Sequence, residues 1–251
     1  MKFRFKAFSI HLISSATVLA LILGGLYLGW YRWPGWYLSN VSKVVVVMIG
    51  VDVMLGPTLT FIIANKNKPR RELMRDLGVI VVVQLCALLY GSVSLWNGRP
   101  ICYAYSEGFL QLVQAYDISA EEMRLGRERN PSLTPFWYSL PRWVWAPLPQ
   151  DNDTQQKILA SAVAGGDDVI SMPQYYKRWE DGLSSLRSQL KKVDELKYFS
   201  KSDKDLLKKK MKDAWLANDQ PDTMVFTGRS SPLLAVFDLK TLSVTALFRT
   251  E

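Results

Sequence analysis

The stretch GVDVMLGPTLTF, residues 50–61, lies inside a long run of apolar residues and places an aspartate, Asp52, near its middle. A carboxylate at the centre of a membrane-spanning helix costs about 2.5–3.5 kcal/mol on insertion scales. Asp52 must therefore be bonded to other groups, serve a function, or both. Pro57 follows five residues later and has no amide hydrogen, which would leave the carbonyl of Val53 without its helical donor. The stretch predicts a local break in an apolar helix beside a carboxylate.

Three apolar runs occupy the first 100 residues, and each approaches or exceeds the roughly 20 residues that cross a bilayer as a helix. They cover residues 8–30, 44–64 and 77–96. We therefore expect three transmembrane α-helices in residues 1–97 and a second domain in residues 98–251. A signal peptide is the alternative for the first run, but that run is longer than a usual signal-peptide core and no small-residue cleavage site ends it.

Positive charges are unevenly distributed among the loops between these runs. The first loop carries only Arg32, whereas the N-terminus and the second loop carry the others: Lys2, Arg4, Lys6, Lys66, Lys68, Arg70, Arg71 and Arg75. Aromatic residues gather at the opposite ends of the runs: Trp30, Tyr31, Trp33, Trp36, Tyr37 and Trp96. Both patterns predict a multi-pass protein of a bacterial inner (plasma) membrane, with a cytoplasmic N-terminus and a periplasmic C-terminal domain.

The net charge of +8 does not indicate a nucleic-acid partner once it is divided along the chain. Residues 98–251 contain 21 Lys and Arg against 20 Asp and Glu, so the excess lies in the loops next to the apolar runs. Membrane lipid with anionic headgroups explains such an excess. The basic run 208–212 is flanked by Asp205 and Asp213 and is interpreted as a solvated helix face.

The second domain is expected to be α+β, with an antiparallel sheet built from both of its ends. A hairpin, or a strand with a turn, is predicted over 101–105 and 109–116. A helix is expected after Ser119, and an extended connector over 131–149. Further helices are expected at 154–164, at 173–192, and from Ser202 or Asp203 through Leu207, Met211 and Trp215. Three strands then follow at 223–228, 232–239 and 242–248, the last two joined by a turn near Lys240 and Thr241.

Catalytic, metal and cofactor sites find little support in the sequence. His11 is the only histidine, and there is no G-x-S-x-G, P-loop, H-E-x-x-H or C-x-x-C motif. The two cysteines, Cys86 and Cys102, are separated by about 24 Å of helix, too far for a disulfide, and we expect Cys102 to be buried. We therefore expect no catalytic residue, no metal site and no cofactor.

Polar and small residues form a stripe on the second and third apolar runs. Asp52, Gly56 and Thr60 share one helix face because they are four residues apart. The third run carries Gln84, Ala87, Tyr90, Gly91 and Ser94 within an arc of about 120°. Matching depths along the two antiparallel helices predicts that Asp52 meets Tyr90 and that Gln84 meets the broken backbone near Pro57. Two interpretations stay open, one in which the stripe only holds the helices together and one in which it also receives a partner's membrane helix.

Three segments carry a resemblance to a known family: GVDVMLGPTLTFIIANKNK at 50–68, RDLGVIVVVQLCALLYG at 75–91 and NGRP at 97–100. They resemble the TfpX/TfpZ family of type IV pilin accessory proteins. The matching positions are Gly50, Asp52, Gly56, Pro57, Thr60, Lys68, Asp76, Gln84, Ala87, Tyr90, Gly91, Arg99 and Pro100. Residues 118–220 match nothing in the family pattern.

The resemblance implies an inner-membrane factor that binds the major type IV pilin and assists its stability, assembly or retraction, without catalysis. Its candidate partner-binding or packing residues are those of the stripe and of the exit from the third run: Asp52, Gly56, Pro57, Thr60, Gln84, Tyr90, Gly91, Arg99 and Pro100. The second-ranked interpretation is a membrane-anchored periplasmic sensor or ligand-binding module, although we expect no cytoplasmic output domain. A transporter or membrane enzyme with Asp52 as proton carrier ranks third, because three helices and one histidine offer little for it.

Overall fold

The computed structural model describes residues 1–213, 222–238 and 241–249, and the chain divides into two compact units. One unit comprises residues 1–32 and 40–98 and is helical; we call it the helical unit. The other comprises residues 33–39 with residues from 99 onward and contains a β-sheet; we call it the sheet domain. Part of the loop between the first two apolar runs therefore belongs to the sheet domain.

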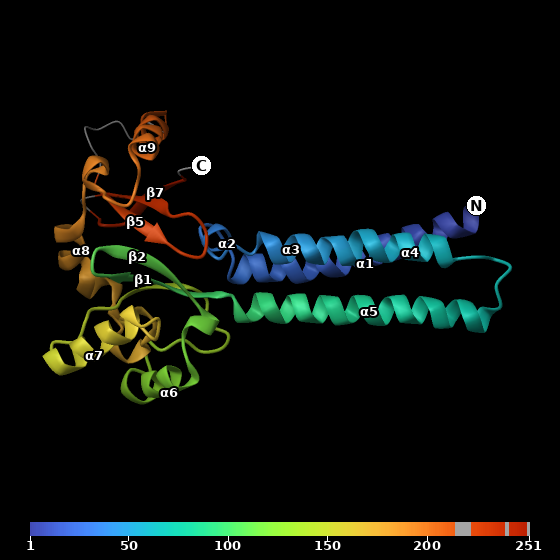
Figure 1. Cartoon of the computed structure of the whole chain (residues 1–251), viewed down its shortest axis with the longest axis horizontal. Helices are drawn as coiled ribbons and strands as arrows, with labels where there is room; N and C mark the ends of the chain where they lie inside the picture. Colours follow the sequence, from blue (N-terminus) through green and yellow to red (C-terminus); the bar gives the residue numbers. More distant parts are fainter. Residues whose placement is uncertain (214–221, 239–240, 250–251) are drawn as a thin grey trace. The chain divides into compact units, whose positions relative to one another are not determined.

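The helical unit contains three helices that are long and apolar enough to cross a membrane, among the residues described. They cover Lys2–Gly29, Ser42–Ile63 and Arg70–Asn97, in agreement with the three predicted runs (Figure 1). The first is α1 and the third is α5. The second consists of α3 (Ser42–Ile49), a π-helical segment η1 (Gly50–Leu55) and α4 (Gly56–Ile63).

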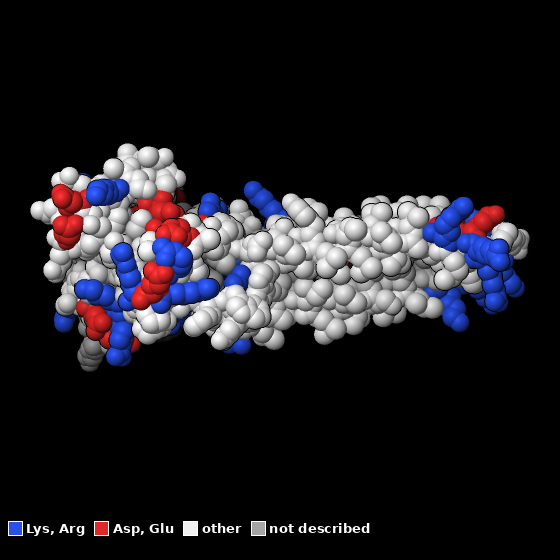
Figure 2. All heavy atoms as spheres, turned by 90° about the horizontal axis from the view of Figure 1, so that it is seen from below, with Lys and Arg blue, Asp and Glu red and all other residues white. Residues whose placement is uncertain are grey.

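Apart from the buried Asp52, the charged side chains of the helical unit lie at its ends. Figure 2 shows its flank free of Lys, Arg, Asp and Glu, with positive side chains gathered at the end that holds the α4–α5 loop and the N-terminus. Lys68 of that loop is ion-paired with Asp76 of α5, and Nε of Arg75, also in α5, lies 3.5 Å from the same carboxylate. The apolar flank and the basic end are properties of a helix bundle that faces lipid.

The sheet domain is built on a seven-stranded mixed sheet in the order β4-β3-β1-β2-β5-β6-β7. The strands are β1 (Pro100–Ser106), β2 (Phe109–Gln114), β3 (Arg142–Trp145), β4 (Lys177–Arg178), β5 (Thr223–Thr227), β6 (Leu233–Phe237) and β7 (Val244–Arg249). The predicted hairpin and the three C-terminal strands are confirmed. The all-antiparallel sheet is wrong, because β1 pairs with β3 and β2 with β5 in parallel. The connector 131–149 supplies β3, which the prediction treated as non-strand.

Side chains alternate between the two faces of the sheet along each strand, and both faces are buried over the central strands β1, β5 and β6. One face carries Tyr105, Leu110, Met224 and Phe226 and packs on Leu186 of α8 (Leu183–Gln189). The other face is covered in two places. Over β1 and β3 it packs on Met123 of α6 (Ala120–Arg129), and over β5 and β6 on Leu207 and Met211 of α9 (Lys201–Asp213).

The remaining elements of the sheet domain test the other helix predictions. Ser119 caps α6, accepting a hydrogen bond from the amide of Glu122 at 3.2 Å, and α7 (Asn152–Val163) ends before Gly165, whose φ of 81° is left-handed.

The helix predicted over 173–192 is wrong. Residues there form short 3₁₀ turns, strand β4 and only two turns of α8, because Asn130 Nδ2 bonds the carbonyls of Pro173 and Tyr176 and fixes that backbone outside a helix. Trp215 and Lys240, named in two predictions, lie outside the described residues.

Five 3₁₀ turns complete the domain in the part of the chain that is described: η2 (Ala115–Asp117), η3 (Val169–Ser171), η4 (Pro173–Tyr175), η5 (Trp179–Gly182) and η6 (Val193–Glu195). Cys102 is buried, as predicted, and its Sγ donates to Oη of Tyr176 at 3.6 Å.

A short helix from the loop between the first two apolar runs is part of the sheet core. This helix, α2 (Gly35–Leu38), places Leu38 fully out of solvent among the residues of one sheet face. The carbonyl of Leu38 accepts hydrogen bonds from the amides of Arg229 at 2.6 Å and Ser230 at 3.3 Å. The guanidinium of Arg249 lies over the ring of Tyr37, 4.1 Å from its centroid. These contacts fasten the loop to the C-terminal strands.

Candidate functional site in the helical unit

The helix break predicted at Pro57 takes the form of a π-helical segment. In η1 the amide of Gly56 donates to the carbonyl of Val51, five residues back, rather than to the residue four back. The next bond of this register would join the nitrogen of Pro57 to the carbonyl of Asp52, and proline has no hydrogen to donate. The carbonyl that loses its donor is therefore that of Asp52, one residue before the position that an ordinary α-helix would leave open.

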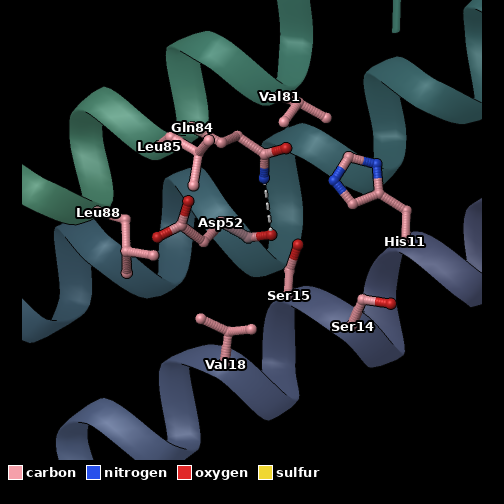
Figure 3. A pocket seen from close by; sticks show the side chains of 9 residues that line it. All are labelled: His11, Ser14, Ser15, Val18, Asp52, Val81, Gln84, Leu85 and Leu88. Atoms are coloured by element: carbon pink, nitrogen blue, oxygen red, sulfur yellow. Dashed lines mark hydrogen bonds between the residues drawn. The ribbon is translucent and has the colours of Figure 1, made fainter. Parts of the chain in front are cut away.

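Gln84 of α5 supplies the missing donor. Its side-chain Nε2 donates to the main-chain oxygen of Asp52 at 3.1 Å, and Gln84 itself is buried (Figure 3). The approach requires glycine at position 56, because a Cβ there would lie 2.0 Å from Nε2 of Gln84. The predicted contact between Gln84 and the broken backbone near Pro57 is confirmed, with the acceptor at Asp52.

The carboxylate of Asp52 points into the interior of the helical unit. Asp52 is 4 % exposed, and its Oδ2 has no hydrogen-bond partner among the described residues. In Figure 3 the carboxylate lies on the side of a pocket that Leu85 and Leu88 line. A buried carboxylate oxygen without a donor is costly in an apolar setting, and such groups in apolar helices commonly mark functional positions.

The pocket is a cavity of about 210 Å³ between the three helices, and its walls are mainly apolar. Its residues are His11, Ser14, Ser15, Val18, Asp52, Val81, Gln84, Leu85 and Leu88. The ring of His11 points into it, while Nδ1 of His11 lies 2.6 Å from Oγ1 of the buried Thr60 (Figure 3). One carboxylate, one imidazole, one side-chain amide and two serines thus line an otherwise apolar space.

A second glycine sets how closely the helices pack. A Cβ at Gly91 of α5 would lie 2.6 Å from Cγ and Sδ of Met48 of α3, so the methionine fills the space that the glycine leaves. The buried residues of α5 in the helical unit are Ile80, Gln84, Gly91 and Leu95, which form one narrow stripe along the helix. Gly91 therefore belongs to the packing seam that also carries Gln84.

Tyr90 does not meet Asp52, and this prediction is wrong. Its side chain is 79 % exposed, whereas Asp52 faces the interior. Matching depths placed the two residues level, but depth leaves the rotation of the helix undetermined. Six residues separate Tyr90 from Gln84, which turns it by about 120° from the seam at 3.6 residues per turn.

Arg99 and Pro100 lie in the sheet domain, apart from the polar pocket. Pro100 begins β1 opposite Gln114 of β2. Arg99 is buried, its carbonyl accepts from the amide of Ala115, and its Nη2 donates to the carbonyl of Trp137 at 2.6 Å. The two residues fix the first strand and a loop of the sheet domain.

Sequence reasoning missed the contribution of α1 to the pocket. His11 was noted only as the single histidine, and Ser14 and Ser15 were not singled out. Their spacing with Val18, at three to four residues, places them on one face of a helix and was the available signal.

No group of three or more His, Cys, Asp and Glu that could hold a metal ion occurs among the residues described. The arrangement can bind a hydrogen-bond donor or a cationic group presented from apolar surroundings.

Comparison with curated proteins identifies relatives. A fimbrial assembly protein of serogroups C1 and C2 from Dichelobacter nodosus is 31 % identical over 121 residues, which cover 48 % of this chain and 92 % of the relative. The chain belongs to this family of fimbrial assembly proteins. Two further members from the same organism, named for serogroups I and E1, are 26 % and 24 % identical over 192 residues, 75 % of this chain and 72 % of each relative. No family model and no solved structure matches this member of the family.

Proposed function

We propose that this protein is a non-catalytic accessory factor of type IV pilus assembly, of the TfpX/TfpZ kind, that binds the major pilin. The names of its relatives support a role in assembling fimbriae. The motif around Asp52, Gln84 and Arg99 supports the narrower family. Binding is the favoured mode of action because the pocket offers recognition groups in an apolar setting and the sequence carries none of the catalytic motifs named above.

The protein is anchored by its three apolar helices in the inner membrane, with the sheet domain in the periplasm. Three helices of sufficient length support the anchoring. The basic N-terminus and α4–α5 loop support their placement on the cytoplasmic side. A pilin held in the same membrane by an apolar helix would then present that helix to the flank of the helical unit.

One observation carries the proposal that the helical unit docks this helix: Oδ2 of Asp52 is buried without a partner at the wall of a cavity. A group that only held the three helices together would be bonded within them, as the side chain of Gln84 is. A donor on the pilin helix would satisfy Asp52, and a helix without one would leave the carboxylate unpaired. The pocket would thus confer selectivity as well as affinity.

Complementation tests this function. A strain that lacks the gene is supplied with the natural protein, with Asp52→Asn, or with Thr58→Ala as control, since Thr58 is an exposed residue of the same helix that bonds only its own backbone among the described contacts. We expect surface pili to be lost in the deletion and with Asp52→Asn at normal protein level, and to return with Thr58→Ala. Normal piliation in the deletion strain would contradict the function, and normal piliation with Asp52→Asn would remove Asp52 from it.

Ligand binding by the sheet domain is the second candidate function. It is favoured by a polar pocket of about 470 Å³ at the carboxyl ends of the parallel strands β2 and β5, where mixed sheets commonly bind ligands. Asp117, Asp168 and Arg229 line it, and Arg229 is ion-paired with Asp117 at 2.7 Å. Mass spectrometry of the purified protein under non-denaturing conditions tests it, and a bound small molecule displaced by Arg229→Ala would support it.

A further inference from the structure

A turn of the sheet domain exposes an unusual group of aromatic side chains. Phe136, Trp137 and Tyr138 are 49 %, 66 % and 59 % exposed, and Leu140 is 60 % exposed. No Lys, Arg, Asp or Glu occurs from residue 131 to 141. Exposed apolar groups without intervening charge mark surfaces that bind other molecules or membranes. We call residues 136–140 the aromatic turn.

The aromatic turn is held in one shape. The amide of Ser139 donates to the carbonyl of Phe136 at 3.0 Å, and the hydroxyl of Ser139 accepts from the amide of Phe136 at 2.8 Å. The rings of Phe136 and Tyr138 stack with centroids 5.9 Å apart, and Trp137 meets Tyr138 edge-on at 5.4 Å. The rings are therefore presented together, and binding through them costs little conformational entropy.

Arg99 ties this turn to the end of the third apolar helix. Its Nη2 donates to the carbonyl of Trp137 at 2.6 Å. Arg99 follows the last residue of α5, Asn97, by two positions, so their Cα atoms are separated by at most about 7 Å. One arginine side chain and two residues of backbone are thus all that separate the aromatic turn from the helix terminus.

The end of α5 is itself marked by aromatic residues. Trp96 packs edge-on against Trp30, the residue that follows α1, with ring centroids 5.1 Å apart. Tryptophans at the ends of membrane helices lie at the level of the lipid headgroups. If α5 crosses the bilayer, the headgroup layer is within reach of the aromatic turn.

We propose that the aromatic turn inserts its side chains into the headgroup layer of the outer leaflet and so binds the sheet domain to the lipid surface. The proposal rests on the membrane anchoring proposed above. Aromatic rings with one polar edge suit this layer, and the lack of charge in residues 131–141 permits their insertion. Arg99 is then a positioning residue that holds the turn through the carbonyl of Trp137.

Depth-dependent fluorescence quenching in proteoliposomes tests the proposal on the full chain. An environment-sensitive dye is attached at Tyr138→Cys in a Cys86→Ser background, where the remaining Cys102 is buried. Liposomes of zwitterionic and anionic phospholipid carry a nitroxide group near the headgroup. Two matched positions serve as controls: Val163→Cys on α7, which is 90 % exposed, and Leu89→Cys on α5, which is 63 % exposed.

We expect the dye at position 138 to be quenched at least about twofold more than the dye at position 163. Adding Phe136→Ser and Trp137→Ser should lower quenching at 138 to the level at 163, and both changes are at exposed positions that leave the fold intact. The proposal would be overturned if the dyes at positions 138 and 163 were quenched equally while the dye at position 89 was still quenched. This result would mean that the aromatic turn contacts another protein or remains in water. Loss of quenching at 89 would instead contradict the membrane anchoring itself.

Discussion

The side-chain amide of Gln84 donates to the main-chain carbonyl of Asp52 at 3.1 Å, and this bond joins two helices through residues that are 32 positions apart in sequence. This carbonyl is the one that Pro57 leaves without a donor in the π-helical register. One side chain of α5 therefore compensates for a break in the backbone of the second helix, and Gly56 provides the space for it. The geometry leaves the carboxylate of Asp52 turned toward the pocket.

Replacing Gln84 by leucine should destabilise the helical unit. Gln84→Leu keeps the size of the side chain but leaves the carbonyl of Asp52 buried without a donor, and we expect a loss of about 0.5–2 kcal/mol in the free energy of unfolding. Ser94→Ala is the control, since Ser94 is on the same helix and bonds only its own backbone among the described contacts. The free energy of unfolding of both variants is measured in mixed detergent micelles. Equal effects of the two changes would contradict the role given to Gln84.

Gly56→Ala should be destabilising through Gln84 specifically. The added Cβ would lie 2.0 Å from Nε2, so the amide must leave its acceptor. We expect a loss of about 1–3 kcal/mol, whereas Gly78→Ala, with no atom within 4 Å of its added Cβ, should be neutral or stabilising. In a double-mutant cycle, Gly56→Ala should cost much less when Gln84 is alanine. Additive effects would show that the clash is relieved elsewhere.

Leu38→Ala should destabilise the sheet domain although Leu38 lies between two apolar helices in sequence. Leu38 is fully buried in the core of one sheet face, so truncation is expected to cost about 2–5 kcal/mol. Leu159→Ala, at an exposed position on α7, is the control and should change little. Hydrogen exchange at the amides of β5 and β6 reports on the domain directly. Unchanged protection there with Leu38→Ala would contradict the assignment of residues 33–39 to this domain.

Alkaline pH should destabilise the sheet domain through Cys102 and Tyr103. Burial raises the pKa of each side chain to about 12, from ordinary values of about 8.5 and 10 when unfolded. Because the folded state holds these protons more tightly, the stabilisation is complete below about pH 8.5 and is lost as the pH rises toward 12. We expect the thermal midpoint of the domain to fall over this window.

Cys102→Ala separates the two groups. Without the thiol, the decline between about pH 8.5 and 10 should flatten. The decline above pH 10 should remain, because burial raises the pKa of Tyr103 and that of Tyr176 as well. The two proteins are compared by the slope of the thermal midpoint against pH, because the substitution also changes packing and so shifts the midpoint at every pH. An identical slope in both proteins would show that Cys102 does not contribute to the pH dependence.

Periodicity and length predicted much of the fold because they report on single elements. The three apolar helices, the cap at Ser119 and the hairpin of β1 and β2 all follow from local patterns. The sequence pattern left undetermined how strands pair across long separations, so the parallel neighbours β1 and β3 were missed. The helix predicted over 173–192 was wrong because the bonds from Asn130 that fix the backbone at Pro173 and Tyr176 come from more than 40 residues away, where a local pattern does not report them.

The polar site was predicted only in part, again because local patterns do not determine how separate elements pack. Helix spacing placed Asp52, Gly56 and Thr60 on one buried face, and depth matching brought Gln84 to the backbone break. Tyr90 was misplaced because helix rotation depends on packing that polar residues alone do not reveal. The carbonyl without a helical donor is that of Asp52 rather than that of Val53 because the segment adopts the π-helical register. Pro57 indicates that the helix is interrupted, but the sequence does not show how many residues each turn contains.

Site-specific photocrosslinking in cells tests the central claim, that the pocket of the helical unit receives the pilin helix. A photoreactive amino acid is placed at Leu85, which lines the pocket, or at Val83, which is exposed about 160° away on the same helix. The account predicts crosslinks to the major pilin from position 85, weak or absent crosslinks from 83, and loss of the former with Asp52→Asn. Equal crosslinking from both positions, or crosslinks from 85 that persist undiminished with Asp52→Asn, would contradict it.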